Sequence, residues 1–225
     1  MPLPAPIDCV IFGGGAAGLW TLDAIVRSGR SVVLLESAEL GAGQTVAAQG
    51  IIHGGFKYTL RGLLTASASS VASMPDTWRA CLAGEREPPL QSTRVRAHYC
   101  HLWQTRSLVS AIGMFGARAG LRVTPEIIDR ESRPPALKEC PGSVARIAEQ
   151  VIDPVSLLHD LARRHADRIL RIDARVGVEF RCEGAGTVRV VSLINPAVGD
   201  VLDIAPTTVV LAAGAGNAAL RTAAG

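Results

Sequence analysis

The chain has 225 residues, of which 48% are apolar and 19% charged, and its formal net charge is +3. It is too hydrophobic for a disordered chain, and its scattered positive charges form no basic stripe, so we expect no nucleic acid partner. No apolar stretch approaches the roughly 20 residues that span a bilayer, so we expect no membrane span. Five separated cysteines without a CxxC pair, and an N-terminus without a signal-peptide pattern, predict a cytoplasmic protein without a metal site.

The beginning of the chain reads as strand, glycine turn, helix and strand. The short apolar run Asp8–Phe12 predicts a buried strand, and helical periodicity extends over Ala16–Arg27. Ser28–Arg30, with its central glycine, ends this helix, and Ser31–Leu35 predicts a second buried strand that leads into Glu36. This order predicts a βαβ unit with a right-handed crossover.

The rest of the chain predicts a mixture of elements. Small residues favour an ordered loop over 41–55, and Asp153-Pro154 is typical of a helix start. Residues 188–194 and 201–204 look like an antiparallel hairpin. Further helices are expected over 60–82, with a break near Met74-Pro75, and over 107–119. A connector is expected over 132–142. Strands are expected over 99–103, 169–172, 176–180 and 208–212.

A GxGxxG pattern opens the first predicted helix. Gly13 permits the tight turn off the strand, Gly15 leaves room for a pyrophosphate, and Gly18 lets the helix pack closely against the strand. The helix N-terminus, with the amides of Ala16 and Ala17, offers donors and a positive dipole end to an anion. The pattern alone is weak, but its strand and helix context favours a dinucleotide.

An acid stands at the end of the second predicted strand. Glu36 lies 18 residues beyond Gly18, where a carboxylate accepts hydrogen bonds from adenosine ribose hydroxyls and repels the 2′-phosphate of NADP. Ser37 is a neighbouring candidate contact. The alternative is a plain glycine turn followed by a solvated glutamate, and the combined pattern favours the dinucleotide.

Three stretches carry a family resemblance, namely Asp8–Glu36, Gly41–Gly55 and Val209–Gly214. Together they resemble the D-amino-acid oxidase and glycine oxidase family of FAD-dependent oxidoreductases. Within the second stretch, Ile52–Tyr58 is similar to a loop of FAD-dependent glycerol-3-phosphate dehydrogenases. The resemblance implies FAD as cofactor, and it adds the candidate contacts Thr45, Ala48, Gln49, Gly50, Ile51, Val176, Ala212, Ala213 and Gly214.

The resemblance also implies the organisation of the chain. We expect an α/β fold in which a Rossmann-like FAD-binding domain carries an inserted, mixed β-rich substrate region. The FAD-binding domain is predicted over 1–85, 149–177 and 207–225, and the substrate region over 86–148 and 178–206. Family members are longer, so the chain is expected to be truncated at its C-terminus and to need a partner chain or a missing C-terminal segment.

The implied reaction is oxidation of a small amine, amino acid or hydroxy compound by hydride transfer to flavin. Two alternatives stay open, an NAD-dependent dehydrogenase and a non-catalytic, truncated flavin-binding fragment. His53, in the glycine-rich loop, is the catalytic candidate: it acts as a base, contacts the flavin or is its covalent attachment point, or else bonds to backbone. Tyr99, His101 and Trp103 are expected on one strand face, where packing is favoured over metal binding.

Overall fold

The computed structural model describes residues 4–54, 71, 73–104, 125–173, 177–184, 187–195 and 197–225. The chain divides into two compact units. Unit 1 comprises Met1–Ala48 and Pro154–Gly225, and unit 2 comprises Gln49–Asp153. In the described part of the chain, every helix is too short or too polar to cross a membrane.

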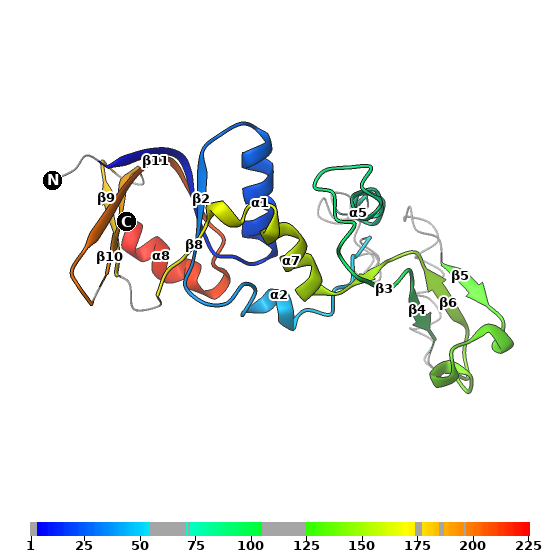
Figure 1. Ribbon diagram of the computed structural model, residues 1–225. Coiled ribbons are helices and arrows are strands. Elements are labelled where there is room, and N and C mark those ends of the chain that lie inside the picture. The colour runs from blue at the N-terminus through cyan, green and yellow to red at the C-terminus, as the bar shows by residue number, and fades with distance from the viewer. Residues whose placement is uncertain are drawn as a thin grey trace. The chain divides into compact units, whose positions relative to one another are not determined.

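Unit 1 is built on a six-stranded sheet (Figure 1). The strand order is β8, β2, β1, β11, β10, β9; the first four strands run parallel, and the last three are joined antiparallel. The strands are β1 (Ala5–Phe12), β2 (Val32–Glu36), β8 (Ile169–Arg171), β9 (Gly177–Cys182), β10 (Val188–Ile194) and β11 (Val201–Leu211).

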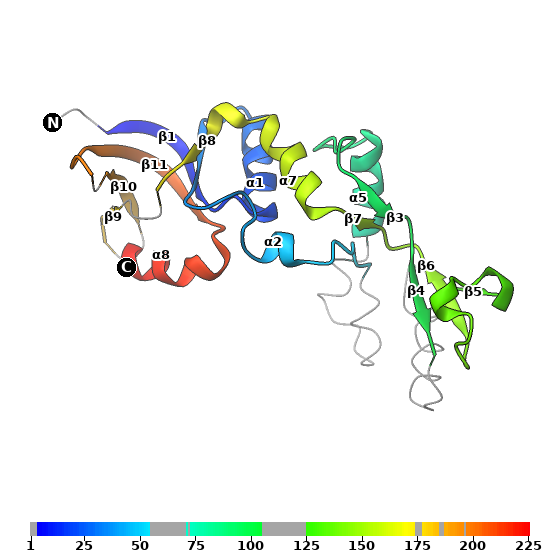
Figure 2. The ribbon, with the colours of Figure 1, turned by 60° about the horizontal axis from the view of Figure 1, so that its bottom comes forward.

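Helix α1 (Ala16–Arg27) connects β1 to β2, so the predicted βαβ unit and the α/β fold with a Rossmann-like domain are confirmed. Helix α7 (Pro154–Arg163) begins where the Asp153-Pro154 pair predicts a helix start. It packs against α1, beside which it lies in two views, and α1 in turn packs against β2 (Figures 1 and 2). The short C-terminal helix α8 (Asn217–Ala224) packs against β9.

Two parallel strands of unit 1, β1 from Cys9 onward and β2, are buried on both faces. Val10 and Phe12 of β1 belong to one apolar cluster with Leu35 of β2 and with Val191 and Leu193 of β10. The alternate residues of β1 and β2, which point to the opposite face because successive side chains of a strand alternate, are also buried. Burial on both faces explains why these strands read as continuous apolar runs in the sequence.

The structure corrects the prediction of two strands over 201–204 and 208–212. β11 is one continuous strand that pairs antiparallel with β10 over Val201–Ile204 and parallel with β1 from Ile204 to Leu211. Pro206 lies between the two predicted strands in the sequence. This proline lies just past the last residue paired with β10, where a strand tolerates a residue without an amide hydrogen. The predicted hairpin of β10 with residues 201–204 is confirmed.

Unit 2 contains helices and strands. A three-stranded antiparallel sheet has the order β4, β6, β5, and a separate antiparallel pair joins β3 to β7. The elements are α5 (Met74–Ala83), β3 (Val95–Ala97), β4 (Cys100–Trp103), β5 (Glu126–Ile128), β6 (Val144–Ile147) and β7 (Val151–Ile152).

Three other local predictions have different outcomes. The loop predicted over 41–55 contains a short helix, α2 (Gln44–Ala47), whose small residues give it no apolar face to detect. The break predicted near Met74-Pro75 is the start of α5, with the proline in the first turn, where its missing amide hydrogen costs nothing. The helix predicted over 107–119, and most of the one over 60–82, lie outside the described residues.

The compact units do not follow the predicted domain boundaries. Residues 49–85 and 149–153 are predicted in the FAD-binding domain, yet they belong to unit 2. Residues 178–206 were grouped with the substrate region, yet they belong to unit 1 because β9 and β10 extend its sheet through β11. Which stretches form the FAD-binding and the substrate domains in the functional sense stays a prediction.

Candidate nucleotide-binding site

The turn after β1 requires glycine at its first position. Gly13 has a φ of +107°, which L side chains rarely adopt, and a Cβ there would lie 2.5 Å from the carbonyl oxygen of Ala212. Its amide donates to the carbonyl oxygen of Leu35 at 2.9 Å, which ties the turn to the end of β2. The turn therefore lies directly between β2 and β11.

The other two glycines of the pattern serve different purposes. A Cβ on Gly18 would lie 1.9 Å from the carbonyl oxygen of Gly13, so Gly18 lets α1 pack closely on the turn. Gly15 precedes α1 with φ −78° and ψ −178°, a conformation that any residue adopts. Its absent side chain leaves space, since a Cβ would meet only the Thr45 hydroxyl oxygen, at 3.1 Å.

The carboxylate of Glu36 lies against the glycine turn. Its Oε2 accepts a hydrogen bond from the amide of Gly14 at 2.5 Å, and its Oε1 accepts one from the amide of Ala38 at 2.8 Å. A carboxylate has only acceptor atoms, so these amides hold its negative charge at the end of β2. The predicted proximity of the acid and the glycine loop is present in the fold.

A cavity of about 760 Å³ opens beside this turn, entirely within unit 1. The glycine turn, the segment after β2 and the turn after β11 form its walls. Eight predicted contacts line it, namely Gly13, Gly15, Glu36, Ser37, Thr45, Ala212, Ala213 and Gly214. The lining residues that sequence reasoning missed include Ala38, Glu39, Gly41, Ala42, Gln44, Ile172, Asp173, Val178, Ala219 and Leu220.

The segment after β2 returns to the start of α1. The first amides of a helix have no partner within the helix, and the Thr45 hydroxyl accepts a hydrogen bond from one of them, that of Ala16, at 3.1 Å. Gly41 permits the return, since its φ is +70° and a Cβ would lie 2.1 Å from Leu158 of α7. Thr45 thus joins the wall that faces the anion-binding end of α1.

The remaining predicted contacts do not line this cavity. Ala16, Ala17 and Gly18 form the first turn of α1 behind it, and Ala48 ends the first segment of unit 1. Gln49, Gly50 and Ile51 belong to unit 2, where Ile51 forms a β-bridge with Val151. Val176 lies outside the described residues. Their roles in cofactor binding stay predictions.

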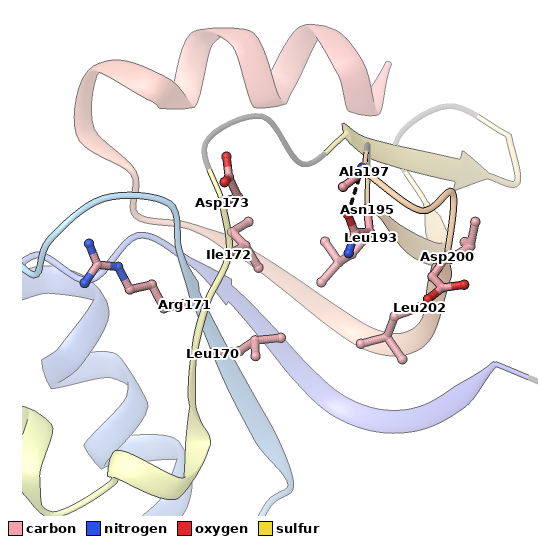
Figure 3. A pocket seen from close by; sticks show the side chains of 10 residues that line it. Leu170, Arg171, Ile172, Asp173, Leu193, Asn195, Ala197, Asp200 and Leu202 are labelled. Carbon is pink, nitrogen blue, oxygen red and sulfur yellow. Dashed lines mark hydrogen bonds between the residues drawn. The ribbon is translucent and has the colours of Figure 1, made fainter.

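A second cavity of unit 1, of about 580 Å³, lies between β8 and the β10–β11 hairpin. Figure 3 shows Leu170, Leu193 and Leu202 projecting into it. Its lining includes no residue of the glycine turn and no predicted site residue. A cavity with an apolar centre and no helix N-terminus suits a dinucleotide diphosphate poorly, so the cavity beside Gly15 is the candidate nucleotide site.

His53, the predicted catalytic residue, lies in unit 2 beside a carboxylate. Its Nδ1 is 3.2 Å from Oε2 of Glu149, while the amide of Gly54 donates to Oε1 at 2.6 Å. The Glu149 side chain is 3% exposed and that of His53 is 49% exposed. Sequence reasoning missed Glu149, because no local pattern connects residues that are 96 positions apart.

The aromatic cluster predicted at 99–103 is only partly packed, because Tyr99 is 41% and Trp103 56% exposed. The rings of Tyr99 and His101 make an edge contact at 5.2 Å between centroids, and the Arg146 guanidinium lies 4.8 Å from the Tyr99 centroid. Burial, and next the positive charge of Arg146, lower the pKa of His101. Among the described residues, no three His, Cys, Asp or Glu side chains are grouped so that they could hold a metal ion.

A strand, glycine turn and helix, with a carboxylate at the end of the next parallel strand, together define a dinucleotide-binding α/β domain. The chain belongs to the family described as FAD dependent oxidoreductase, whose family model matches residues 8–225. The predicted family is thereby confirmed, and FAD is confirmed as the cofactor of that family.

Curated and solved relatives agree with this assignment. The probable FAD-dependent oxidoreductase PA4991 of Pseudomonas aeruginosa is 39% identical over 222 residues, which are 98% of this chain and 54% of that protein. Its crystal structure matches with a TM-score of 0.74 at 33% identity, over 99% of this chain and 52% of that one. Glycine oxidase from Geobacillus kaustophilus shares the fold, with a TM-score of 0.69 at 16% identity, over 97% and 58%. The chain thus spans about half the length of these relatives.

Proposed function

We propose that the chain binds FAD in the cavity beside Gly15 and takes part in the oxidation of a small amine, amino acid or hydroxy compound. In this proposal the glycine turn and the start of α1 bind the diphosphate, and Glu36 accepts hydrogen bonds from the adenosine ribose. FAD, when bound, supplies the hydride acceptor. His53 is the proposed base that removes a proton from the substrate.

Gly15 and Glu36 carry this proposal. The backbone conformation at Gly15 does not require glycine, so its missing side chain is explained by the room that it leaves in the cavity. Glu36 lines the same cavity and already accepts backbone hydrogen bonds there. Small residues around the diphosphate and an acid for the ribose are the groups that an adenine dinucleotide needs.

The choice of FAD over NAD rests on the family. Both dinucleotides use a glycine turn and a strand-end acid, so the site alone does not separate them. The match over residues 8–225 is to a family of FAD-dependent oxidoreductases, which favours FAD over the NAD-dependent alternative. Solved relatives that share the fold include proteins named glycine oxidase, L-proline dehydrogenase and L-amino acid deaminase, which motivates amino acids as the first substrates to test.

Titration of the protein with FAD tests the proposed site. Replacing Glu36→Gln removes the charge that orders the ribose, and hydrogen bonds to charged groups contribute about 1.5–3 kcal/mol, so we expect about 10- to 150-fold weaker FAD binding. Glu179→Gln changes an exposed glutamate on β9 of the same unit and should leave FAD affinity unchanged. Equal FAD affinity in the wild type and Glu36→Gln would contradict the proposed site.

Anaerobic mixing with substrates tests the proposed reaction. A panel of amino acids, amines and hydroxy acids is added to the FAD-loaded protein, and loss of the visible flavin absorbance reports hydride transfer. We expect at least one amino acid to bleach the flavin. A protein that binds FAD but is reduced by no compound of the panel would instead support the alternative of a non-catalytic fragment.

A further inference from the structure

We propose that Glu149 is a positioning residue that holds His53 with its proton on Nδ1, which leaves Nε2 as the proton acceptor. This inference rests on the proposed role of His53 as the base and names the atom that acts and the residue that orients it. It follows from the contacts between the loop at 50–54 and the segment at 149–152 within unit 2.

The main chain fixes the position of the loop that carries His53. The amide of Ile52 donates to the carbonyl oxygen of Gln150, and the amide of Ile152 donates to that of Gly50, both at 2.9 Å. Glu149 directly precedes this paired segment, and its own amide donates to the carbonyl oxygen of Ile147 at 2.8 Å. The carboxylate and the imidazole therefore face each other from two segments held by backbone hydrogen bonds.

The chemistry of the two side chains decides the tautomer. As a carboxylate, Glu149 has only acceptor atoms, and its Oε1 already accepts the Gly54 amide. Its Oε2 accepts from His53 only if Nδ1 carries a proton. In a neutral imidazole, the second nitrogen then has a free electron pair. The carboxylate is 3% exposed and the imidazole 49%, so the ring stays accessible for a substrate while Glu149 is sheltered.

In the proposed reaction, His53 takes up a proton of the substrate through Nε2. The bond between the substrate nitrogen or oxygen and its proton breaks, and a bond between that proton and Nε2 of His53 forms. The imidazole becomes an imidazolium whose Nδ1–H still faces the Glu149 carboxylate, so the new positive charge is next to a negative one. The electron pair freed on that nitrogen or oxygen forms a double bond to the neighbouring carbon, and FAD, when bound, would accept the hydrogen of that carbon with its two electrons as hydride.

A neighbouring thiol does not compete for this role. Burial, and next the negative charge of Glu149, raise the pKa of the Cys100 thiol above its usual value. A thiol of raised pKa remains protonated and is a poor nucleophile and a poor base at neutral pH. Of the groups beside Glu149, His53 is therefore the one suited to accept a proton.

Nitrogen-15 NMR of the FAD-loaded protein reads the tautomer directly at a pH where the ring is neutral. His53→Gln identifies the His53 signals. In the wild type we expect Nδ1 to be protonated and Nε2 to be bare. In Glu149→Gln, the Gly54 amide keeps the side-chain oxygen on its side, so the new NH2 group faces Nδ1 and the proton moves to Nε2. Glu126→Gln, an exposed change on β5 of the same unit, should leave the ring as in the wild type.

Two results would overturn the inference: a wild-type ring protonated on Nε2, or a tautomer that does not respond to Glu149→Gln. In the reaction with an amino acid that reduces the flavin, we expect Glu149→Gln to slow reduction by about 10²- to 10⁴-fold, because a base with the wrong tautomer cannot accept the proton. If the tautomer is unchanged in Glu149→Gln and reduction is nevertheless slowed, the role of Glu149 is merely structural. Failure of the proposed FAD site would appear in the FAD titration and not in the ring tautomer.

Discussion

Two alanine substitutions in the GxGxxG pattern should have different effects. Gly18→Ala should lower the stability of the protein, and Gly15→Ala should weaken FAD binding. Gly18→Ala places a methyl group 1.9 Å from a backbone carbonyl oxygen, whereas real Cβ contacts are essentially never under 3.0 Å. Gly15→Ala places a methyl group in the cavity, 3.1 Å from the flexible Thr45 hydroxyl. The first change disturbs the packing of α1, and the second occupies the space that we assign to the diphosphate.

Gly18→Ala should lower the free energy of unfolding, because the steric cost of the methyl group exceeds the gain in helix propensity. Alanine within a helix is favoured over glycine by up to about 1 kcal/mol. Overpacking costs about 1–3 kcal/mol or more, and here the carbonyl of Gly13 must withdraw by more than an ångström, since backbone cannot escape by changing rotamer. We therefore expect a net loss of about 1–2 kcal/mol, or roughly 2–8 °C in melting temperature for a chain of this length.

The expected effect at Gly15 is on affinity. Its backbone conformation suits alanine, and Thr45 can move by a few tenths of an ångström, so the melting temperature of the unliganded protein should change little. Moving a phosphate off its amide donors loses charge-assisted hydrogen bonds of about 1.5–3 kcal/mol, which weakens FAD binding about 10- to 150-fold.

Thermal melts and FAD titrations of both variants, beside the wild type, separate the two effects. We expect Gly18→Ala to melt lower without FAD, and Gly15→Ala to melt normally but to bind FAD weakly. A Gly15→Ala protein that binds FAD as tightly as the wild type would refute the placement of the diphosphate. A Gly18→Ala protein with an unchanged melting temperature would refute the packing argument.

Three further measurements test other parts of the fold. Asp23→Asn removes the buried carboxylate that pairs with Arg27 of α1 and forms a hydrogen bond with His165 after α7, so urea denaturation should show a loss of about 1.5–3 kcal/mol. Because the pKa of His101 is lowered in the fold, its contribution to stability is complete above about pH 6.5 and is lost as the pH falls below that value. Arg146→Gln removes a positive charge that lowers this pKa. Denaturation curves at neutral and acidic pH should therefore show a smaller decrease in the free energy of unfolding for Arg146→Gln than for the wild type. Alkylation of the native protein, followed by mass spectrometry, should modify exposed Cys182 and spare Cys9, whose thiol is buried and has a raised pKa.

The sequence predicts the βαβ unit well because its signals are local. The apolar run before Gly13, the helical spacing after it and the acid at Glu36 lie within one short stretch, and each is set by residues that contact one another in the fold. The bounds of α1 agree with the prediction at both ends, since glycines flank it on either side. Such local sequence signals predict the structure correctly here because the tertiary contacts favour the same turn and helix ends.

The parts that sequence reasoning missed depend on contacts between distant segments. Pro206 suggests a break, and only the pairing of β11 first with β10 and then with β1 shows why the strand continues. Glu149 stands in no motif, and it becomes a partner of His53 only because the loop at 50–54 pairs with residues 149–152. Hydrophobic periodicity contains no information on such pairings, so neither feature could be predicted from one sequence.

The candidate nucleotide site and the candidate base differ in the kind of group that they use. Around Gly15 half of the residues that line the cavity are glycine or alanine, so we expect binding of the diphosphate there to depend on backbone amides and on space. The polar side chains of the wall are Glu36, Ser37, Glu39, Gln44, Thr45 and Asp173. Backbone donors bind the diphosphate of any FAD-linked reaction alike and do not select a substrate. The His53–Glu149 pair consists of side chains, whose replacement changes chemistry without altering a phosphate contact. We therefore expect variants of the His53–Glu149 pair to slow flavin reduction while FAD affinity stays constant. Variants of the glycine turn should instead weaken FAD binding while the rate of reduction of the bound flavin stays constant.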